Sequence, residues 1–542
     1  MEIDENTTPS TRDIIHAGFE NLGRAKELLS EVCSAGDLEL TQRELLGELA
    51  HCADPDVALD ALHELIISFA DRPGKLHGLL HGRSPRTLLQ VLGASRQLGV
   101  LMRSRPELVE AAAVDSLHSA GFDGEARRAT MLAAIDAHEE QLGAADSSDS
   151  SFRRLITDVP LAEATNRLRR NYYEQLAAIM AYDVSHDDPI AIQPAVSRAL
   201  SDLADAALES ALAIAQSNTE ESELLRFTII GMGKLGAQEL NYVSDVDLIY
   251  VVEPMAETMS QPQLVKVGSK IAMLMQKICQ SVMPNVMEPA LWQIDGALRP
   301  EGKDGPLVRR LDSHKAYYRQ WAESWEFQAL LKARAVAGDV PLGEAYMQMA
   351  SEFVWQASRR ENFVSDCQRM RERVESLIPV PLRDREIKLG RGGLRDVEFT
   401  VQMLQLVHGR ADETLHVRST LQALQALSDG GYVSRRHARV LSHDYRFERV
   451  LEHRQQMWQL KRTHLFPDMG NANAGGLEKK RTVNVEELSR NAELHRLARV
   501  FGWHNEELVD NFDETRRQIR RLHNEIYYRP MLPISAVSGD ER

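Results

Sequence analysis

The chain has 542 residues, of which 43% are hydrophobic and 27% are charged, and its formal net charge is −16. Its length predicts about three or four domains, and its acidity argues against a general nucleic-acid binder, because affinity for the phosphate backbone needs clustered lysine and arginine. No apolar run reaches the roughly 18 residues of a membrane span, and the polar, acidic N-terminus does not resemble a signal peptide. We therefore expect a cytoplasmic protein with reduced cysteines that binds neither nucleic acid nor membrane.

The first part of the chain predicts a tail followed by helices. We expect residues 1–12 to form a flexible tail and residues 13–216 a helical region, because apolar residues recur there near the helical period of about 3.6 residues. Asp54 and Pro55 are typical of a helix start, and the sequence DSSDSS at residues 146–151 is typical of a loop. The helices before residue 152 carry no catalytic signature, so we expect them to form a scaffold.

The strongest signal lies in residues 217–340, where the segment FTIIGMGKLGAQELNYVSDVDLIYVV runs from Phe227 to Val252. It predicts a strand, a glycine-rich turn, a short helical stretch and a second strand that begins near Asp245 and Asp247. On a strand the two carboxylates leave the same face, with Cα atoms about 6.6 to 6.8 Å apart, while Val246 points into the core. Such a pair suits Mg²⁺, which binds carboxylates together with substrate phosphates.

The glycines of this segment leave two interpretations open. Gly231, Gly233 and Gly236 allow the backbone to approach a phosphate, but they also match the G-x-G-x-x-G pattern of a Rossmann unit, with Glu253 as the ribose-binding acid. Against the Rossmann unit, residues 237–242 form fewer than about two helical turns, whereas parallel strands usually need about a dozen or more connecting residues. The short connection therefore favours a different pairing of the strands.

A third carboxylate is supplied by Asp295, at the end of a short strand predicted over residues 291–295. Alone it is typical of a strand-end turn, and it becomes a candidate ligand only when a neighbouring strand brings it beside the first pair. An amphipathic helix is predicted between them, over residues 263–282. Further along, Lys332 and Arg334 would share one face of an extended segment and contact phosphate oxygens, or else form a solvated helix end.

After the strand-bearing part the chain returns to helical patterns. Residues 341–530 predict a C-terminal helical domain, and residues 531–542 a linker or tail. The sequence KLGRGG at residues 388–393 predicts a tight loop, which is followed by a helix over residues 394–407.

This loop gathers charges of both signs. Lys388, Arg391 and Arg395 place positive charge at the start of the helix, which makes it a candidate anion site. Asp396 and Glu398 have a simpler interpretation as first-turn acids that compensate the helix dipole.

Four sequence blocks occur in order: GMGKLGAQELNYVSDVDLI from residue 231, DGALRPEGKDGPLV from residue 295, YYRQWAESWEFQALLKARAVAGD from residue 317, and IKLGRGGLRDVEFTVQ from residue 387. Together they resemble the glutamine-synthetase adenylyltransferase/adenylyl-removing enzymes, and the last block is also similar to one in the uridylyltransferases of PII-type signal proteins.

The resemblance also suggests which part of the family's chain is present. Chains of the family usually carry two such modules in tandem, and this chain contains one. Asn241 to Ser244 resembles the first, N-terminal module, which removes AMP, and HVRSTLQALQAL suggests the actinobacterial branch. Ala297 stands where many relatives have arginine, so a phosphate contact expected there would have to come from Arg299 or from another residue.

The resemblance implies an α+β, predominantly helical protein, in which a nucleotidyltransferase-fold domain with a short mixed β-sheet is flanked by an N-terminal helical region and a C-terminal helical bundle. It implies Mg²⁺-dependent phosphorolysis of adenylylated tyrosine on glutamine synthetase, which gives ADP and reactivates that enzyme in the regulation of nitrogen assimilation. A PII-type signal protein is the implied regulatory partner. Forward adenylylation from ATP and a non-catalytic nucleotide- or partner-binding module remain alternatives.

The same resemblance assigns roles to individual residues. The metal is expected to be held by Asp245, Asp247 and Asp295, which are also the expected catalytic residues. Nucleotide or phosphate binding is expected at Gly233, Lys234, Gly236, Ser244, Arg299, Lys332, Arg334, Lys388, Arg391 and Arg395.

Overall fold

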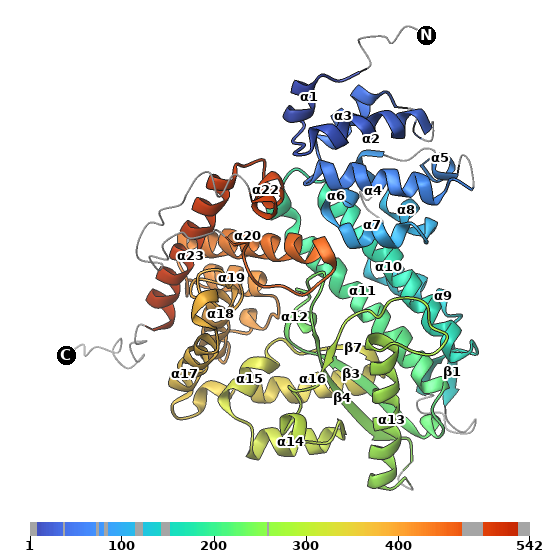
Figure 1. The fold of residues 1–542 in the computed structure, drawn as a ribbon. Helices are drawn as coiled ribbons and strands as arrows, with labels where there is room; N and C mark the ends of the chain where they lie inside the picture. The colour runs from blue at the N-terminus through green and yellow to red at the C-terminus, as the bar shows by residue number, and fades with distance from the viewer. Residues whose placement is uncertain are drawn as a thin grey trace, which may run out of the picture.

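The computed structural model describes residues 8–528, except residues 36–37, 39, 72–74, 81–84, 114–122, 143–151, 257–258 and 469–490. Helices dominate the described residues and surround a five-stranded sheet (Figure 1). Residues 1–7, the predicted loop at 146–151 and the tail at 531–542 lie outside the described residues, and the expected domain boundaries stay predictions.

Short helices form the N-terminal region at the top of Figure 1. Asp54 caps one of them as predicted, since its Oδ1 accepts a hydrogen bond of 3.0 Å from the Val57 amide. The first helix begins at Thr11, inside the expected tail, because Ser10 and Asp13 form a reciprocal capping box. The helices are α1 (Thr11–His16), α2 (Leu22–Ala35), α3 (Gln42–Leu49), α4 (Pro55–Ser68), α5 (Lys75–Leu80), α6 (Pro85–Ala94), α7 (Arg96–Met102), α8 (Pro106–Ala112) and α9 (Gly124–Ala134).

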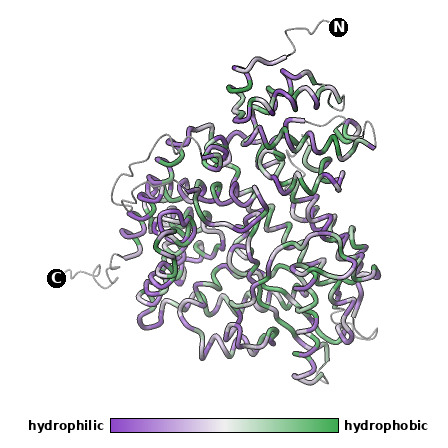
Figure 2. The backbone as a smooth tube through the Cα atoms, viewed as in Figure 1, coloured by the Kyte–Doolittle hydropathy of each residue, from purple (hydrophilic) through white to green (hydrophobic). Residues whose placement is uncertain are grey.

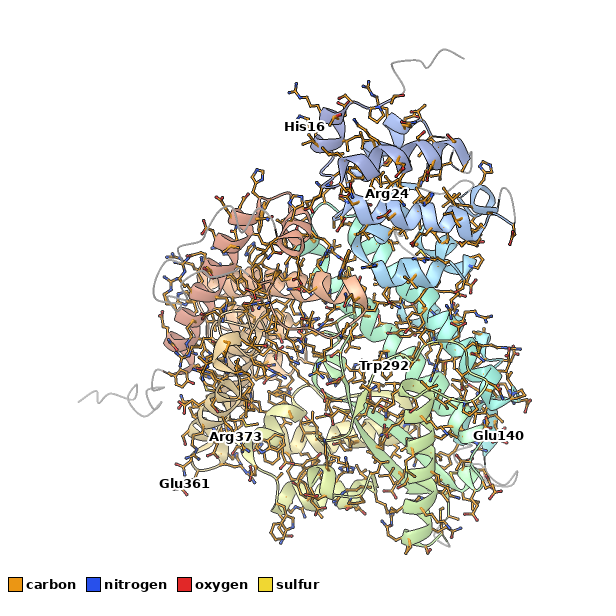
Figure 3. The ribbon with its side chains drawn as sticks, viewed as in Figure 1. His16, Arg24, Glu140, Trp292, Glu361 and Arg373 are labelled. Carbon is orange, nitrogen blue, oxygen red and sulfur yellow. The ribbon has the colours of Figure 1, made fainter. Side chains whose placement is uncertain are left out.

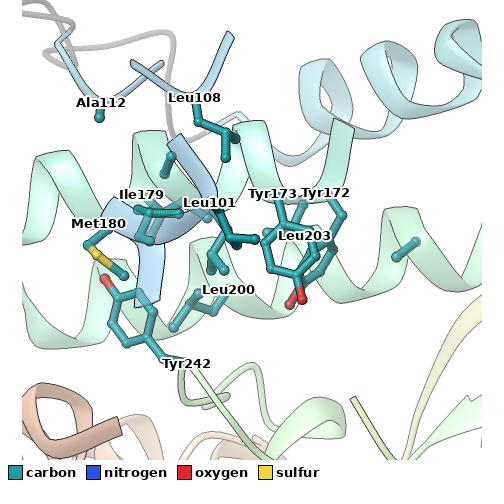
Figure 4. Packing of buried hydrophobic residues seen from close by; sticks show 14 of the residues in the cluster. Leu101, Leu108, Ala112, Tyr172, Tyr173, Ile179, Met180, Leu200, Leu203 and Tyr242 are labelled. Atoms are coloured by element: carbon teal, nitrogen blue, oxygen red, sulfur yellow. The ribbon is translucent and has the colours of Figure 1, made fainter. Parts of the chain in front are cut away.

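The prediction of helices throughout residues 13–216 was wrong at one antiparallel pair, β1 (His138–Leu142) with β2 (Phe152–Ile156). These strands read HEEQL and FRRLI, so charged side chains mask the alternation that would have marked them. The long helices α10 (Leu161–Ser185) and α11 (Pro189–Ser217) follow, and they pack on each other and on α8, α9 and the central sheet. Figure 4 shows buried side chains of this contact, including Ile179 and Leu203.

The central sheet has the strand order β5-β4-β3-β7, and β6 also pairs with β4. Strand β3 is antiparallel to β4 and to β7, whereas β5 and β6 run parallel to β4, so the sheet is mixed as expected. The antiparallel β3–β4 pair excludes the Rossmann interpretation, because that unit requires a parallel pair joined by a crossover helix. The strands are β3 (Leu225–Gly231), β4 (Val246–Pro254), β5 (Ile294–Asp295), β6 (Val308–Arg309) and β7 (Arg334–Gly338).

The connection from β3 to β4 differs in detail from the prediction. One turn of helix, α12 (Gly233–Gly236), forms within the glycine-rich turn itself, while residues 237–242, which were expected to be helical, have no helix. The expected strand at residues 291–295 is reduced to β5. The amphipathic helix is present as α13 (Gln261–Gln280).

Side chains alternate along the strands, so each strand contributes to both faces of the sheet. Both faces are covered by helices and are buried. Ile229 and Tyr250 belong to a core shared with α11 and α13, whereas Ile230 and Ile249 belong to a core on the opposite face. That second core includes side chains of α14 (Leu311–Gln320), α15 (Ser324–Leu330), α16 (Val340–Val354) and α17 (Phe363–Ser376). Figure 3 shows Trp292, just before β5, in the interior, and His16 and Glu361 at the periphery.

The C-terminal helices occupy the left side of Figure 1 and have a core of their own. They are α18 (Leu394–His408), which was predicted, α19 (Thr420–Asp429), α20 (Arg435–Gln459), α22 (Ala492–Arg499) and α23 (Asn505–Tyr527). Hydrophilic and hydrophobic positions interchange along these helices (Figure 2), as expected for amphipathic packing. None of the helices within the described residues combines the length and apolarity that a membrane crossing requires.

Candidate active site

The strand register brings two of the three predicted carboxylates together. Asp247 on β4 pairs in parallel register with Asp295 on β5, and Val246 between the first two aspartates is buried, as the strand pattern predicted. Asp245 lies one residue before β4. Neighbouring strands lie about 4.8 Å apart, so paired residues on one face have side chains within reach of a common ligand.

The glycine turn presses directly against this pair. Gly233 has a φ of +53°, and a Cβ atom built on it would lie 2.6 Å from Oδ2 of Asp247. At Gly236, a Cβ atom would lie 1.8 Å from the carbonyl oxygen of Lys332. Both positions therefore require glycine, the first because of its backbone conformation and its approach to the carboxylate. The contact of Gly233 with Asp247 holds the turn against the start of β4.

The electrostatics of the pair fit a cation. The pKa of Asp247 is raised to about 6, chiefly by burial and also by the negative charges of Asp295 and Asp245, while Lys388 and Arg395 oppose the shift. Carboxylates whose charged forms disfavour one another in this way would be stabilised by a divalent cation. Asp247 and Asp295 are thus the side chains that would hold Mg²⁺, and Asp245 is the adjacent third candidate.

Asp245 has a different partner in the structure. Its carboxylate forms an ion pair with the Arg462 guanidinium, which comes from the segment after α20. Among the described residues, no group of three or more His, Cys, Asp or Glu side chains is assembled for metal binding. The expected three-aspartate arrangement is therefore not preformed, because Arg462 occupies the Asp245 carboxylate.

The predicted loop at residues 388–393 and the start of α18 supply positive charge to the same place. Arg395 Nη1 donates a hydrogen bond of 2.6 Å to Glu398, and this carboxylate holds the pKa of Arg395 above its ordinary value. Burial lowers the pKa of Lys388, and the nearby Arg395 lowers it further. Lys388 forms no ion pair with any described residue. Both cations act on Asp247, which places them at the candidate site.

The two acids near the start of α18 have a larger role than dipole compensation. Asp396 is completely buried and pairs with Arg371, and its Oδ2 also accepts a 2.7 Å hydrogen bond from the Gly392 amide. Glu398 is almost completely buried beside Arg395. Burial alone would raise the pKa of Glu398, but the surrounding Arg395 and lysine charges lower it to about 2. Glu398 is therefore ionised and fixes Arg395.

Lys234 connects the glycine turn to the C-terminal helices. Its ammonium lies 3.0 Å from both carboxylate oxygens of Glu452 on α20, and His464 contacts the same carboxylate at 3.1 Å. Burial shifts the pKa of Lys234 well below its ordinary value. His464 also accepts a 3.2 Å hydrogen bond from Arg462, so one polar network joins α12 to the residue that pairs with Asp245.

Several predicted phosphate ligands have structural partners instead. Lys332 donates to Glu239 at 2.9 Å, and Arg334 forms a two-pronged ion pair with Asp205 on α11 at 2.6 and 3.1 Å. The two side chains that were expected to contact phosphate thus each contact a carboxylate of the protein. Arg334 also donates a hydrogen bond to the Leu235 carbonyl. These pairs lock β7 to its neighbours.

Three further candidates are also engaged elsewhere. Arg299 donates to the carbonyl oxygens of its own loop, at 2.7 Å for Gly296 and 3.1 Å for Lys303, so it braces the turn after β5. Arg391 pairs with Glu375 on α17. The Ser244 hydroxyl donates to the Asp245 carbonyl at 3.0 Å. The candidate site therefore centres on the aspartates, Gly233, Lys388 and Arg395.

Sequence reasoning missed Glu452 and Arg462. Glu452 had no signal in the helical pattern, because its neighbours three and four positions away are all polar: Glu448, Arg449, Gln455 and Gln456. Arg462 had none, since its contact with Asp245 joins residues 217 positions apart.

Comparison with known proteins identifies two family models along the chain. Residues 86–349 match the model described as glutamate-ammonia ligase adenylyltransferase, and residues 368–527 match the GlnD PII-uridylyltransferase model. The first match contains the aspartates and the glycine turn. The second contains the loop with Lys388 and Arg395.

Curated relatives agree with these models. A protein of Bifidobacterium longum subsp. infantis is 59% identical over 97% of this chain and 48% of its own length. A protein of Cutibacterium acnes is 41% identical over 89% of this chain and 45% of its own length, and one of Streptomyces avermitilis is 40% identical over 96% of this chain and 47% of its own length. All three relatives are described as bifunctional glutamine synthetase adenylyltransferase/adenylyl-removing enzymes. The chain therefore belongs to the family of bifunctional glutamine synthetase adenylyltransferase/adenylyl-removing enzymes, and it spans about half the length of the curated relatives it matches.

Proposed function

We propose that this chain removes AMP from an adenylylated tyrosine of glutamine synthetase by phosphorolysis, with Mg²⁺ as cofactor. The observation that carries the proposal is the parallel register of Asp247 with Asp295, crowded by Gly233 and faced by Lys388 and Arg395. Carboxylates and cations in one place suit a phosphoryl centre, where catalysis consists of positioning and charge stabilisation. The name of the relatives supplies the substrate.

The reaction transfers the adenylyl group from tyrosine to phosphate. An oxygen of inorganic phosphate attacks the phosphorus of the adenylyl group, the bond from phosphorus to the tyrosyl oxygen breaks, and the proton of the attacking phosphate ends on the phenol. The products are ADP and the unmodified tyrosine. A bound Mg²⁺ would neutralise the charge that develops on the leaving phenolate, whose ordinary pKa is about 10.

The chain's own residues have distinct parts in this scheme. Asp247 and Asp295 would hold the metal, with Asp245 joining them when Arg462 releases it. Lys388 and Arg395 would attract the two phosphate-bearing reactants, and Glu398 keeps Arg395 charged and in place. Gly233 leaves room beside the Asp247 carboxylate.

The direction of the reaction rests on a different observation from the site. Asn241 to Ser244 resembles the family's adenylyl-removing module, whereas the site geometry serves forward adenylylation from ATP equally well. We propose a PII-type signal protein as regulatory partner because residues 368–527 match the PII-uridylyltransferase model. We also propose that the enzyme works in the cytoplasm, where glutamine synthetase acts.

Product analysis tests this proposal. The chain is incubated with glutamine synthetase that carries radiolabelled AMP, with Mg²⁺ and increasing phosphate, and the label is followed by chromatography. We expect labelled ADP in proportion to phosphate and no free AMP. Consumption of ATP with release of pyrophosphate and new AMP on glutamine synthetase would assign the forward reaction. Absence of any turnover would favour a non-catalytic binding module.

A further inference from the structure

A cavity of about 1060 Å³ lies apart from the aspartates, between the turn after α12 and the C-terminal helices. It is bounded by α11, the segment Gly236–Glu239, and helices α19 and α20. Its lining contains seven arginines and two carboxylates, Glu239 and Asp429. This is a local excess of positive charge in a chain whose net charge is −16. None of Asp245, Asp247 and Asp295 lines it.

Most of these arginines have no acidic side chain within ion-pair distance among the described residues. Arg334 pairs with Asp205, and Arg449 lies 3.8 Å from Glu452. Within the described part of the chain, the remaining five form no ion pair with an acidic side chain: Arg198, Arg418, Arg435, Arg439 and Arg446. Uncompensated guanidinium groups that converge on one cavity attract carboxylates and phosphates, which they bind in a two-pronged fashion.

Unsatisfied donors strengthen this argument. The side chain of Arg449 is buried, and its Nη2 donates to the Glu239 carbonyl at 2.7 Å and to Ser197 at 3.0 Å. Its Nε and Nη1, however, have no hydrogen-bond acceptor among the described residues, and neither does Nε of Arg446. Buried donors without acceptors are rare in native structures. Both arginines line the cavity, so an oxyanion bound there would add negative charge beside these side chains.

The volume of the cavity and its apolar lining residues indicate what kind of ligand would carry the negative charges. Leu421, Leu424 and Ala438 give α19 and α20 an apolar surface beside the arginines. The volume lies just above the range of about 300–1,000 Å³ that is typical of small-molecule sites. A ligand that combines several negative groups with an organic framework therefore fits better than a single phosphate ion.

We propose that this cavity binds a small organic polyanion, with two or more phosphate or carboxylate groups, at a site separate from the aspartates and independent of Mg²⁺. The ligand would contact the segment Gly236–Glu239, which continues directly from the glycine turn beside Asp247. Glu239 in that segment holds Lys332 and the Thr420 amide, at 2.9 and 2.6 Å. A ligand that moves this segment would therefore also move Lys332, just before β7, and Thr420, at the start of α19.

Calorimetric titration of the full 542-residue chain tests the proposal. The probes are ADP, tripolyphosphate and citrate, which separate a nucleotide, a bare polyphosphate and a polycarboxylate. Each is added in excess EDTA and about 0.1 M NaCl, where the Debye length of about 10 Å screens diffuse surface charge. We expect at least one probe to bind with a dissociation constant below about 1 mM.

Three variants locate the binding. The double variant Arg435→Glu/Arg439→Glu should weaken it by about tenfold or more, because two converging positive charges become negative. The control Arg436→Glu reverses one charge at an exposed neighbour that does not line the cavity, and it should stay within about twofold of the original chain. Asp247→Asn should not weaken binding, since the aspartates lie outside the cavity. Circular dichroism checks the fold of each variant.

Four outcomes would overturn the proposal. The first is no binding of ADP, tripolyphosphate or citrate by the original chain. The second is unchanged binding by the double variant. The third is an equal loss in Arg436→Glu, which would indicate general surface charge. The fourth is loss of binding in Asp247→Asn, which would place the anion at the aspartates.

Discussion

The contact between the glycine turn and Asp247 gives a prediction with a built-in control. In Gly233→Ala, the new Cβ atom would lie 2.6 Å from Oδ2 of Asp247, and the φ of +53° would hold alanine in the left-handed region. The backbone strain costs about 1–2 kcal/mol of stability. The carboxylate must also move away from the methyl group, and displacement of a reacting group by about 1 Å costs about a hundredfold in rate.

Gly431→Ala separates the two effects. Gly431 has a φ of +78°, but a Cβ atom there would meet no atom within 4 Å. Both variants should therefore lose about 1–2 kcal/mol in urea unfolding. Only Gly233→Ala should lose turnover, by about tenfold to a hundredfold in the release of ADP from adenylylated glutamine synthetase. Equal turnover in the two variants would refute the argument that Gly233 sets the position of Asp247.

The remaining predictions concern the charges around the aspartates. Asp295→Asn should lower turnover by about a hundredfold or more, because it removes a charged ligand of the proposed metal. The control Asp304→Asn, at an exposed position, should leave turnover unchanged. Equal turnover in the two variants would contradict the proposed metal site. Arg462→Ala should lower the Mg²⁺ concentration for half-maximal activity severalfold, since it frees Asp245, and an unchanged or higher requirement would contradict the competition. The pKa of Glu398 is about 2 in the folded chain against an ordinary value of 4.5, so its stabilisation is complete above about pH 4.5 and is lost as the pH falls toward 2. Urea unfolding of Glu398→Gln between these pH values should show a weaker loss of stability on acidification, and an identical pH dependence would exclude this role.

Local patterns were sufficient for the core of the candidate site. The spacing of Asp245 and Asp247 around a buried Val246 follows from strand geometry. The connection too short for a parallel crossover favoured a different pairing, and the structure has an antiparallel β3–β4 pair. The pairing of Asp295 with Asp247 was a conditional expectation, because register between distant strands is set by tertiary packing. It is present as the β4–β5 pair.

Ion pairs between residues far apart in the sequence account for the roles that the sequence left open. A lysine or arginine near a strand is predicted equally well as a phosphate ligand or as a structural ion pair, because the choice depends on whether a carboxylate from another element approaches it. Lys332 forms an ion pair with Glu239, and Arg334 forms one with Asp205. Buried charges require such partners. The same reason explains why the role of Glu398 beside Arg395 was missed in favour of the helix dipole.

The charge on Asp247 is the most direct test of the central claim. Single-turnover release of ADP from adenylylated glutamine synthetase is measured with saturating Mg²⁺ and phosphate, for the original chain and for Asp247→Asn, with circular dichroism and thermal unfolding as checks of the fold. The account predicts a folded variant whose rate is lower by about several hundredfold, because the substitution removes one charge at the phosphoryl centre while keeping the side chain's shape. A folded Asp247→Asn chain with a near-normal rate would contradict it.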